Sequence, residues 1–249
     1  MGCMVGSRAA PPRHPKGNRL LAALPEADYE VLLPHLEPVA MPLGMVVYES
    51  GDVQHFVYFP VDSVVSRLYV LENGASTELA VTGKEGLVGI SLIMGGQSTL
   101  SRAVVQCAGH GYRVRGTVLR KLFGAGGEAQ HLLLRYALAL ITQMTQTAVC
   151  NCHHVVDQQL CRWLLLMLDR LDSSEVNMTH ELIANMLGVR REGVTEAAGK
   201  LQAERLIEYN RGRIRVLDRE RLEARACECY AVVKREYERL LPRAKVEAA

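Results

Sequence analysis

Long apolar runs are absent from this 249-residue sequence. The longest, near residues 136–141 and 163–168, are bounded by polar groups and fall short of the roughly 20 residues that a membrane-spanning helix needs. Residues 1–19 hold prolines and basic side chains but no apolar signal-peptide core, so we expect a flexible leader and no export. Gly6 stands where an N-myristoylation motif needs Ser or Thr. The sequence therefore predicts a cytoplasmic protein with no membrane partner.

The sequence also lacks a strong net charge, and its number of cysteines is not even. The net charge of +2 is too small to indicate a polyanionic partner, so any case for nucleic acid depends on where the basic residues fall. Seven cysteines, an odd number, suit a reducing compartment better than a disulfide framework. The length and the 49% hydrophobic content are enough for two domains, each with its own core.

The first half of the sequence is rich in short β-type runs separated by turns. Strands are predicted at residues 45–48, 55–59, 63–71, 76–82, 102–107 and 112–115. Asn73-Gly74 predicts a hairpin, because these residues accept the positive φ angles of a tight turn. We expect residues 20–127 to form a small antiparallel β-barrel domain.

A long helix is predicted next, over residues 128–151, where no strong helix breaker occurs. It carries two adjacent apolar stripes at coiled-coil spacing. The first stripe comprises Leu133, Ala137, Leu140, Met144, Thr147 and Asn151, and the second comprises Leu134, Leu138, Ile141, Thr145, Ala148 and Cys152. One stripe would pack on the barrel and the other on the same helix of a second subunit, although a wholly intramolecular helix remains the alternative. Residues 128–153 are thus predicted to be a dimerisation helix and hinge.

The C-terminal part has the pattern of a winged helix-turn-helix. After a helix at residues 154–171, Thr179 caps a second helix that ends at Gly188. A third helix follows over residues 190–206, and two β-type runs around the turn at residues 210–213 form a wing. The predicted domain covers residues 154–230, and residues 231–249 form a C-terminal helix and tail. The fold class is therefore α+β.

The third helix has side chains suited to reading DNA bases. Arginine can pair with guanine and glutamate with cytosine, and such groups act best near the N-terminus of a recognition helix. Basic residues near the helix end and the wing would contact phosphates, and Arg205 and Arg215 add to them. The predicted DNA-binding residues are Arg190, Arg191, Glu192, Thr195, Glu196, Lys200, Arg211 and Arg213. A merely solvated basic surface is the alternative.

The run Gly188-Val189-Arg190-Arg191-Glu192-Gly193-Val194 resembles the start of the recognition helix in the Crp/Fnr superfamily. The resemblance extends over about residues 20–222. It implies a homodimeric transcription regulator that binds promoter DNA and contacts RNA polymerase, with base-reading roles for Arg191 and Glu192. The family often has an arginine where this sequence has Glu196. We therefore do not assume that the protein recognises the operator sequence usual for the family.

The resemblance also implies a cyclic-nucleotide-type effector site, of which only fragments remain. They comprise Gly89, Ile90, Ser101, Arg102 and Ala103. Arg102 would meet a phosphate, but Ile90 stands where a ribose-binding glutamate is expected. An unpaired ligand hydroxyl costs on the order of 1–3 kcal/mol, so cyclic AMP is not expected to act. A salt bridge is the alternative role for Arg102, and the effector is left open.

A cluster of metal-ligating residue types, Cys150, Cys152, His153 and His154, supports a different function, a metal- or thiol-based redox protein. Neighbours on one helix point in different directions, so these four would converge only through a bent hinge or a second subunit. Zinc and haem remain open, whereas a leader with Cys3 alone argues against an iron–sulfur cluster. Cys227 and Cys229 are expected to be structural.

No catalytic set can be recognised in the sequence, so we do not expect an enzyme, and no cofactor is expected. A further alternative is a ligand-binding barrel that regulates protein partners through its C-terminal helices. Loss of duplex binding on replacing Arg191 would separate the DNA-binding hypothesis from both alternatives.

Overall fold

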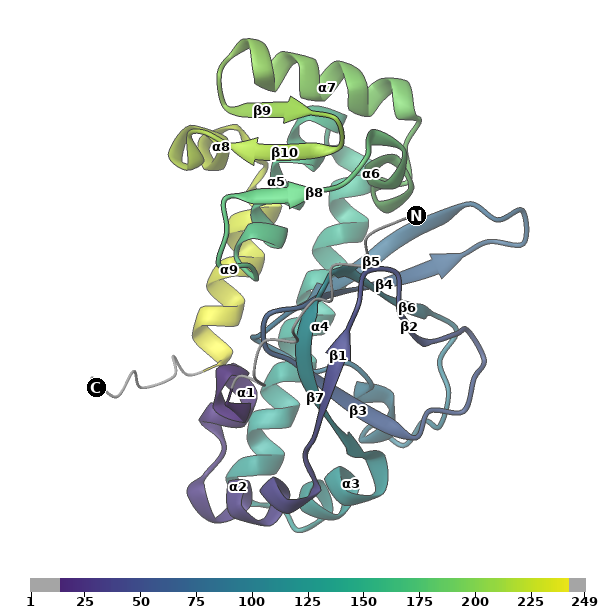
Figure 1. Cartoon of the computed structure of the whole chain (residues 1–249), viewed down its shortest axis with the longest axis vertical. Helices are drawn as coiled ribbons and strands as arrows, with labels where there is room; N and C mark the ends of the chain where they lie inside the picture. Colours follow the sequence, from purple (N-terminus) through teal and green to yellow (C-terminus); the bar gives the residue numbers. More distant parts are fainter. Residues whose placement is uncertain (1–13, 242–249) are drawn as a thin grey trace, which may run out of the picture.

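The computed structural model describes residues 14–241. An N-terminal β-rich half and a C-terminal half lie one above the other along the long axis of the molecule (Figure 1), and a single long helix, α4 (Gly127–His153), runs between them. The predicted combination of antiparallel sheets, a long helix and a C-terminal helix-turn-helix is confirmed.

Two antiparallel sheets form the β-rich half, with strand orders β1–β7–β3 and β2–β6–β4–β5. Their bounds are β1 (Glu37–Met41), β2 (Val46–Tyr48), β3 (Phe56–Pro60), β4 (Val64–Val70), β5 (Ser76–Thr82), β6 (Arg102–Cys107) and β7 (Gly109–Arg115). Met41 and Tyr58 from the first sheet are buried with Val65 and Val105 from the second, so the sheets pack face to face.

All six strands predicted for the β-rich half and both strands predicted for the wing are present, and sequence reasoning missed two others. In the predicted hairpin β4 pairs with β5, and Gly74 takes the positive φ of 83°. The missed strand β1 contains Pro38, which is tolerated because β1 is an edge strand. The other missed strand, β8 (Glu175–Asn177), is too short to show a period of two.

Three short helices also belong to the β-rich half. They are α1 (Arg19–Ala23), α2 (Glu26–Leu32) and α3 (Gly116–Gly124), and 3-10 turns lie at Pro15–Gly17, Leu33–His35 and Ile90–Leu92. The buried Asn18 caps α1, because its side-chain oxygen accepts hydrogen bonds from the Leu20 and Leu21 amides. Its Nδ2 donates to the carbonyls of Pro60 and Gly86, which fastens α1 to the β-rich half.

The two stripes of α4 have different surroundings. In the first stripe, Leu133, Ala137, Leu140 and Thr147 are buried within the chain, and Met144 packs against the same core. Every member of the second stripe is exposed, from Leu134 to Cys152. The first stripe therefore belongs to the intramolecular core as far as Thr147, whereas its last member, Asn151, is exposed. The second stripe is a free apolar face. None of the described helices has both the length and the apolar content to cross a membrane.

The C-terminal half packs helices on a three-stranded sheet of order β8–β10–β9. Its elements are α5 (Val156–Leu168), β8, α6 (His180–Leu187), α7 (Arg191–Ala203), β9 (Ile207–Asn210), β10 (Arg213–Val216), α8 (Arg219–Arg225) and α9 (Glu228–Leu240). Helix α9 runs back beside α4 towards the N-terminal half (Figure 1).

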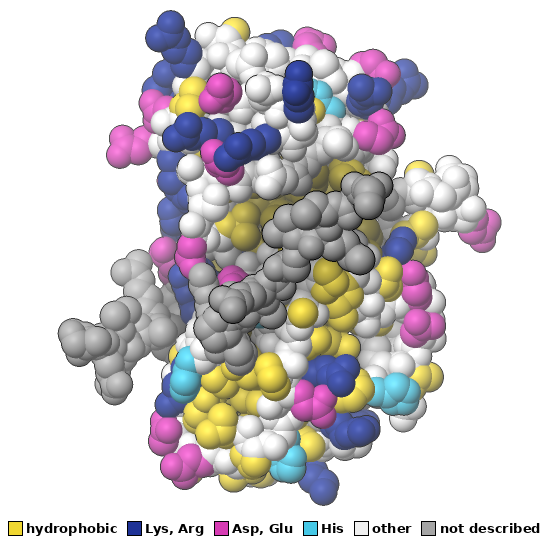
Figure 2. Space-filling model, viewed as in Figure 1, with side chains coloured by type: hydrophobic (Ala, Val, Ile, Leu, Met, Phe, Trp, Pro, Cys, Tyr) yellow, Lys and Arg dark blue, Asp and Glu magenta, His cyan; other side chains and the backbone are white. Residues whose placement is uncertain are grey.

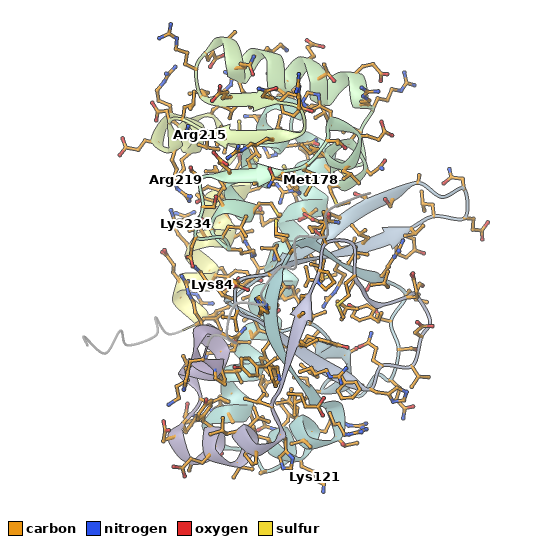
Figure 3. The ribbon with its side chains drawn as sticks, viewed as in Figure 1. Lys84, Lys121, Met178, Arg215, Arg219 and Lys234 are labelled. Carbon is orange, nitrogen blue, oxygen red and sulfur yellow. The ribbon has the colours of Figure 1, made fainter. Side chains whose placement is uncertain are left out.

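The two halves are joined by buried contacts. Leu68 and Val81 of the β-rich half share one apolar core with α5 and α6. The Gln143 side chain of α4 makes two hydrogen bonds with the Val81 backbone, of 3.0 and 3.1 Å. Arg170 pairs with Glu85 at 2.7 Å in a buried position, and Lys84 (Figure 3) pairs with Asp172.

Candidate nucleic-acid interface

Helix α6 begins and ends as its sequence predicts. The Thr179 hydroxyl accepts a hydrogen bond from the Leu182 amide, which caps the helix. Gly188 follows the last turn with a φ of 68°, the left-handed conformation that glycine adopts without cost. The chain then turns, and α7 starts at Arg191 with Arg190 as its N-cap.

Helix α7 has one buried and one exposed face. Val194, Ala197, Ala198 and Leu201 are buried in the domain core. The predicted DNA-binding residues of this segment are all exposed, namely Arg190, Arg191, Glu192, Thr195, Glu196 and Lys200. The packing of α7 therefore leaves these polar side chains available for a ligand.

A tight turn positions the wing beside α7. Strands β9 and β10 pair antiparallel, with Asn210 opposite Arg213. The two residues between them, Arg211 and Gly212, have φ angles of 48° and 82°. Positive φ at both central residues is the type I′ pattern that suits a two-residue hairpin. Arginine rarely adopts this conformation, and its presence there puts a cation at the wing tip.

The start of α7, the wing tip and the start of α6 enclose a hollow of about 570 Å³. Arg191, Thr195, Arg211 and His180 line it, so tertiary structure brings side chains from three elements to one surface. Lys and Arg side chains are spread over this end of the molecule, with acidic side chains between them (Figure 2). The hollow is therefore the strongest candidate for a nucleic-acid interface.

Several of the predicted phosphate-binding cations already have acidic partners. Lys200 pairs with Glu196 at 2.9 Å and lies 3.7 Å from Asp157. On the wing, Arg213 forms an ion pair with Glu175 of β8, and Arg215 (Figure 3) lies 3.7 Å from the same carboxylate. Phosphate binding by Lys200 or Arg213 would have to compete with these carboxylates.

Sequence reasoning missed His180, the first residue of α6. Its ring stacks on Tyr209 of β9 with centroids 4.0 Å apart, and its Nδ1 lies 3.0 Å from the Thr195 hydroxyl. Burial, and secondly the positive charge of Arg191, lower the pKa of His180 below its usual 6.5. The sequence signal that could have found it is its place directly after the helix cap.

We expect His180 to make the domain less stable in mild acid. Because its pKa is lower in the folded than in the unfolded protein, the unfolded protein takes up the proton more readily as the pH falls through 6.5. Urea unfolding at about pH 7.5 and about pH 5.5 should therefore show a smaller loss of unfolding free energy in His180→Gln than in the wild type. An equal loss of unfolding free energy in His180→Gln and the wild type would show that His180 does not have a lowered pKa in the folded protein.

The fragments of the effector site lie at the start of β6 and at the 3-10 turn Ile90–Leu92. Gly89 precedes this turn with a φ of 106°, and Ile90 is buried among apolar side chains. Arg102 is 3.2 Å from the carboxylate of Glu49, which gives this arginine a salt bridge. Ser101 is buried and shares a hydrogen bond with Thr99, and Ala103 lies in the core between the sheets. Arg102 thus has a carboxylate partner where a nucleotide phosphate would compete.

The structure does not gather the predicted Cys150, Cys152, His153 and His154 cluster. Cys152 and His153 are exposed, because they follow Cys150 by two and three residues and lie on other sides of α4. Cys150 and His154, four residues apart, instead meet Cys227 and Cys229 at the start of α9. Sequence analysis treated Cys227 and Cys229 apart from this cluster, as structural residues, and the structure places them beside Cys150 and His154. The Cys-x-Cys spacing of Cys227 and Cys229 and the Cys-x3-His spacing of Cys150 and His154 were the available sequence signals.

Comparison with known proteins agrees with these features. The family model of the Crp-like helix-turn-helix domain matches residues 158–225. No protein of curated function is a significant sequence match.

Solved structures are similar in fold over most of this chain. A Crp/Fnr-family transcriptional regulator from Eubacterium rectale is similar with a TM-score of 0.67 at 17% identity, covering 84% of this chain and 98% of that chain. FixK2 from Bradyrhizobium japonicum is similar with a TM-score of 0.64 at 17% identity, covering 77% of this chain and 98% of FixK2. The c-di-GMP-responsive regulator CLP from Xanthomonas campestris has a TM-score of 0.60 at 16% identity, covering 78% and 100%. The predicted resemblance is thus confirmed: residues 158–225 are a Crp-like helix-turn-helix domain, in a chain with the fold of the Crp/Fnr transcription regulators.

Proposed function

We propose that the protein is a non-enzymatic transcription regulator that binds promoter DNA through α7 and the wing. One observation carries this proposal: Arg191 at the start of α7 and Arg211 at the wing tip line the same hollow. A helix N-terminus with an arginine fork suits base edges in the major groove, and a wing cation suits the adjacent phosphates. This function implies residence in the cytoplasm and contact with RNA polymerase.

The roles of the other predicted residues follow from their positions. We assign Arg191 and Glu192 to base reading, with Arg190, Thr195 and Glu196 beside them on the exposed face of α7. Arg211 is the principal phosphate contact, and Lys200 and Arg213 contribute once released from their carboxylates. Residues 154–230 would be the DNA-binding domain and residues 20–127 the sensory domain.

Enrichment of duplexes from a random library by the purified protein tests this proposal directly, because such a library contains the operator whatever its sequence. A specific sequence should emerge, and an Arg191→Ala protein should fail to enrich it. Enrichment of no sequence by the folded wild type would refute sequence-specific binding.

We also propose a homodimer formed through the second stripe of α4. This stripe is exposed along its full length, although Leu134, Leu138 and Ile141 are large and apolar. The hydroxyls of Thr142 and Thr145 bond to carbonyls one turn back on the helix, which leaves few unsatisfied polar groups on this face. A second copy of α4 would cover the stripe and bring two DNA-binding domains to paired half-sites.

Cyclic AMP is not proposed as the effector. Buried Ile90 cannot accept a hydrogen bond from the ribose, and Glu49 beside Arg102 competes with the phosphate. We expect calorimetry to detect no binding of cyclic AMP at micromolar concentrations. Micromolar binding that is lost in Arg102→Ala would show that the assigned roles of Ile90 and Arg102 are wrong.

A further inference from the structure

Three buried cysteines and a histidine converge where α4 ends and α9 begins. Cys150, Cys227 and Cys229 are all buried, and together with His154 they place one potential ligand atom each within 4.8 Å of one another. Cys150 and His154 are four residues apart at the end of α4, and Cys227 and Cys229 begin α9. This junction lies beside α5, the first helix of the DNA-binding domain.

We propose that Cys150, His154, Cys227 and Cys229 bind one zinc ion, which clamps the start of α9 to the end of α4. Zinc in structural sites takes four thiolate or imidazole ligands in tetrahedral geometry. Zn–S and Zn–N bonds of about 2.3 and 2.0–2.1 Å put neighbouring ligand atoms about 3.5–3.8 Å apart. The Cys150 and Cys227 sulfurs are 3.5 Å apart, and the Cys229 sulfur is 3.7 Å from Nδ1 of His154.

The orientation of His154 suits a metal ligand. Its Nδ1 faces the Cys229 sulfur, whereas its Nε2 lies 3.3 Å from the carboxylate of Glu228. Metal-binding histidines commonly donate their second ring N–H to a carboxylate, which fixes the tautomer and leaves the other nitrogen free for the metal. The Gln159 amide of α5 donates to the His154 carbonyl at 2.8 Å and holds this turn in place.

The charges around the cluster also favour the proposal. Cys227 is the N-cap of α9 and Cys229 lies in its first turn, at the end of the helix where the dipole favours negative charge. Burial raises the pKa of the metal-free Cys229 thiol to about 11, so zinc itself would displace this proton on binding. Three thiolates and a neutral imidazole around Zn²⁺ leave one negative charge. The buried cation Arg162, whose charge acts on both Cys150 and Cys229, would balance it.

Ordinary core packing explains these cysteines less well. Cys161 behaves as a core thiol, because it is buried among apolar side chains of the C-terminal domain. Cys150, Cys227 and Cys229 instead form a separate buried cluster with one another. Such grouping of thiols around an imidazole is expected of a metal site.

Elemental analysis of the untagged full-length protein, purified with a reductant and without chelator, tests the proposal. We expect about one zinc per chain in the wild type. Cys227→Ser and Cys229→Ser should lose most of this zinc. The matched controls are Cys152→Ser and His153→Asn, which change the same residue types on exposed positions of α4 and should keep it.

Two further measurements avoid variants that fold poorly. Adding Co²⁺ to the metal-depleted wild type should give the visible bands of tetrahedral cobalt with sulfur ligands. Glu228→Gln keeps all four ligands and should weaken zinc binding about 10- to 100-fold. A reduced, folded wild type that binds neither Zn²⁺ nor Co²⁺, or zinc that follows Cys152 rather than Cys229, would overturn the proposal. These readouts need no DNA, so their failure is distinct from failure of the DNA-binding function.

Discussion

Replacing Arg191 by alanine is expected to weaken binding to the cognate site by roughly 5- to 150-fold, because one bidentate base contact contributes about 1–3 kcal/mol of discrimination. Binding to scrambled DNA should change much less, so specificity relaxes. Arg191 is exposed at the first position of α7, so the fold should be kept. Titrations on cognate and scrambled duplexes measure both effects.

Replacing Arg211 on the wing should weaken DNA binding in a different way from replacing Arg191. Arg211→Asn is the appropriate change, because asparagine tolerates the positive φ of 48° at this turn. Both duplexes should lose affinity by similar factors, and the salt-dependence slope should fall in magnitude by about one. Arg211 is a cleaner test than Arg213, whose removal would also leave Glu175 without its ion-pair partner.

Arg239→Ala is the matched control, since it removes an exposed cation of α9 that pairs with Glu236 on the same helix. It should change neither affinity nor the salt slope. If Arg191→Ala bound cognate and scrambled DNA with unaltered specificity, the assignment of α7 as the recognition helix would be wrong.

Leu138→Glu combined with Ile141→Glu should convert the dimer to a monomer. These side chains are 47% and 51% exposed in the single chain, so charges there should spare the fold but place like charges in the proposed dimer seam. Sedimentation should then give the mass of one chain, 27.5 kDa. Loss of the second half-site contact should weaken operator binding on the order of 10²-fold or more.

Leu217→Glu is the control for this experiment, because Leu217 is similarly exposed but lies after the wing strand β10. It should remain a dimer. Leu140, by contrast, is only 3% exposed and packs inside the chain, so Leu140→Glu would test folding rather than association. A stable dimer in the Leu138/Ile141 variant would move the interface elsewhere.

Local signals in the sequence were sufficient for most of the secondary structure. The Thr179 cap and Gly188 define α6, and the turn before Arg213 defines the wing, because each depends on backbone preferences of a few neighbouring residues. The exposed face of α7 also follows from helical period alone. The edge strand β1 and the short strand β8 could not be predicted from local sequence, because each pairs with a strand that is distant in the chain.

Contacts between distant segments could be decided only by the tertiary structure. The sequence determined that α4 has two apolar stripes, but both have the same spacing, and only packing against the β-rich half shows that the stripe of Leu140 is buried and that of Leu138 is free. The sequence likewise placed metal-binding residue types at the end of α4. The tertiary structure shows that the cluster contains Cys227 and Cys229 instead of Cys152 and His153, because α9 runs back along α4. Residues about 75 positions apart can meet in space without any repeating pattern in the sequence, so the sequence alone could not predict this contact.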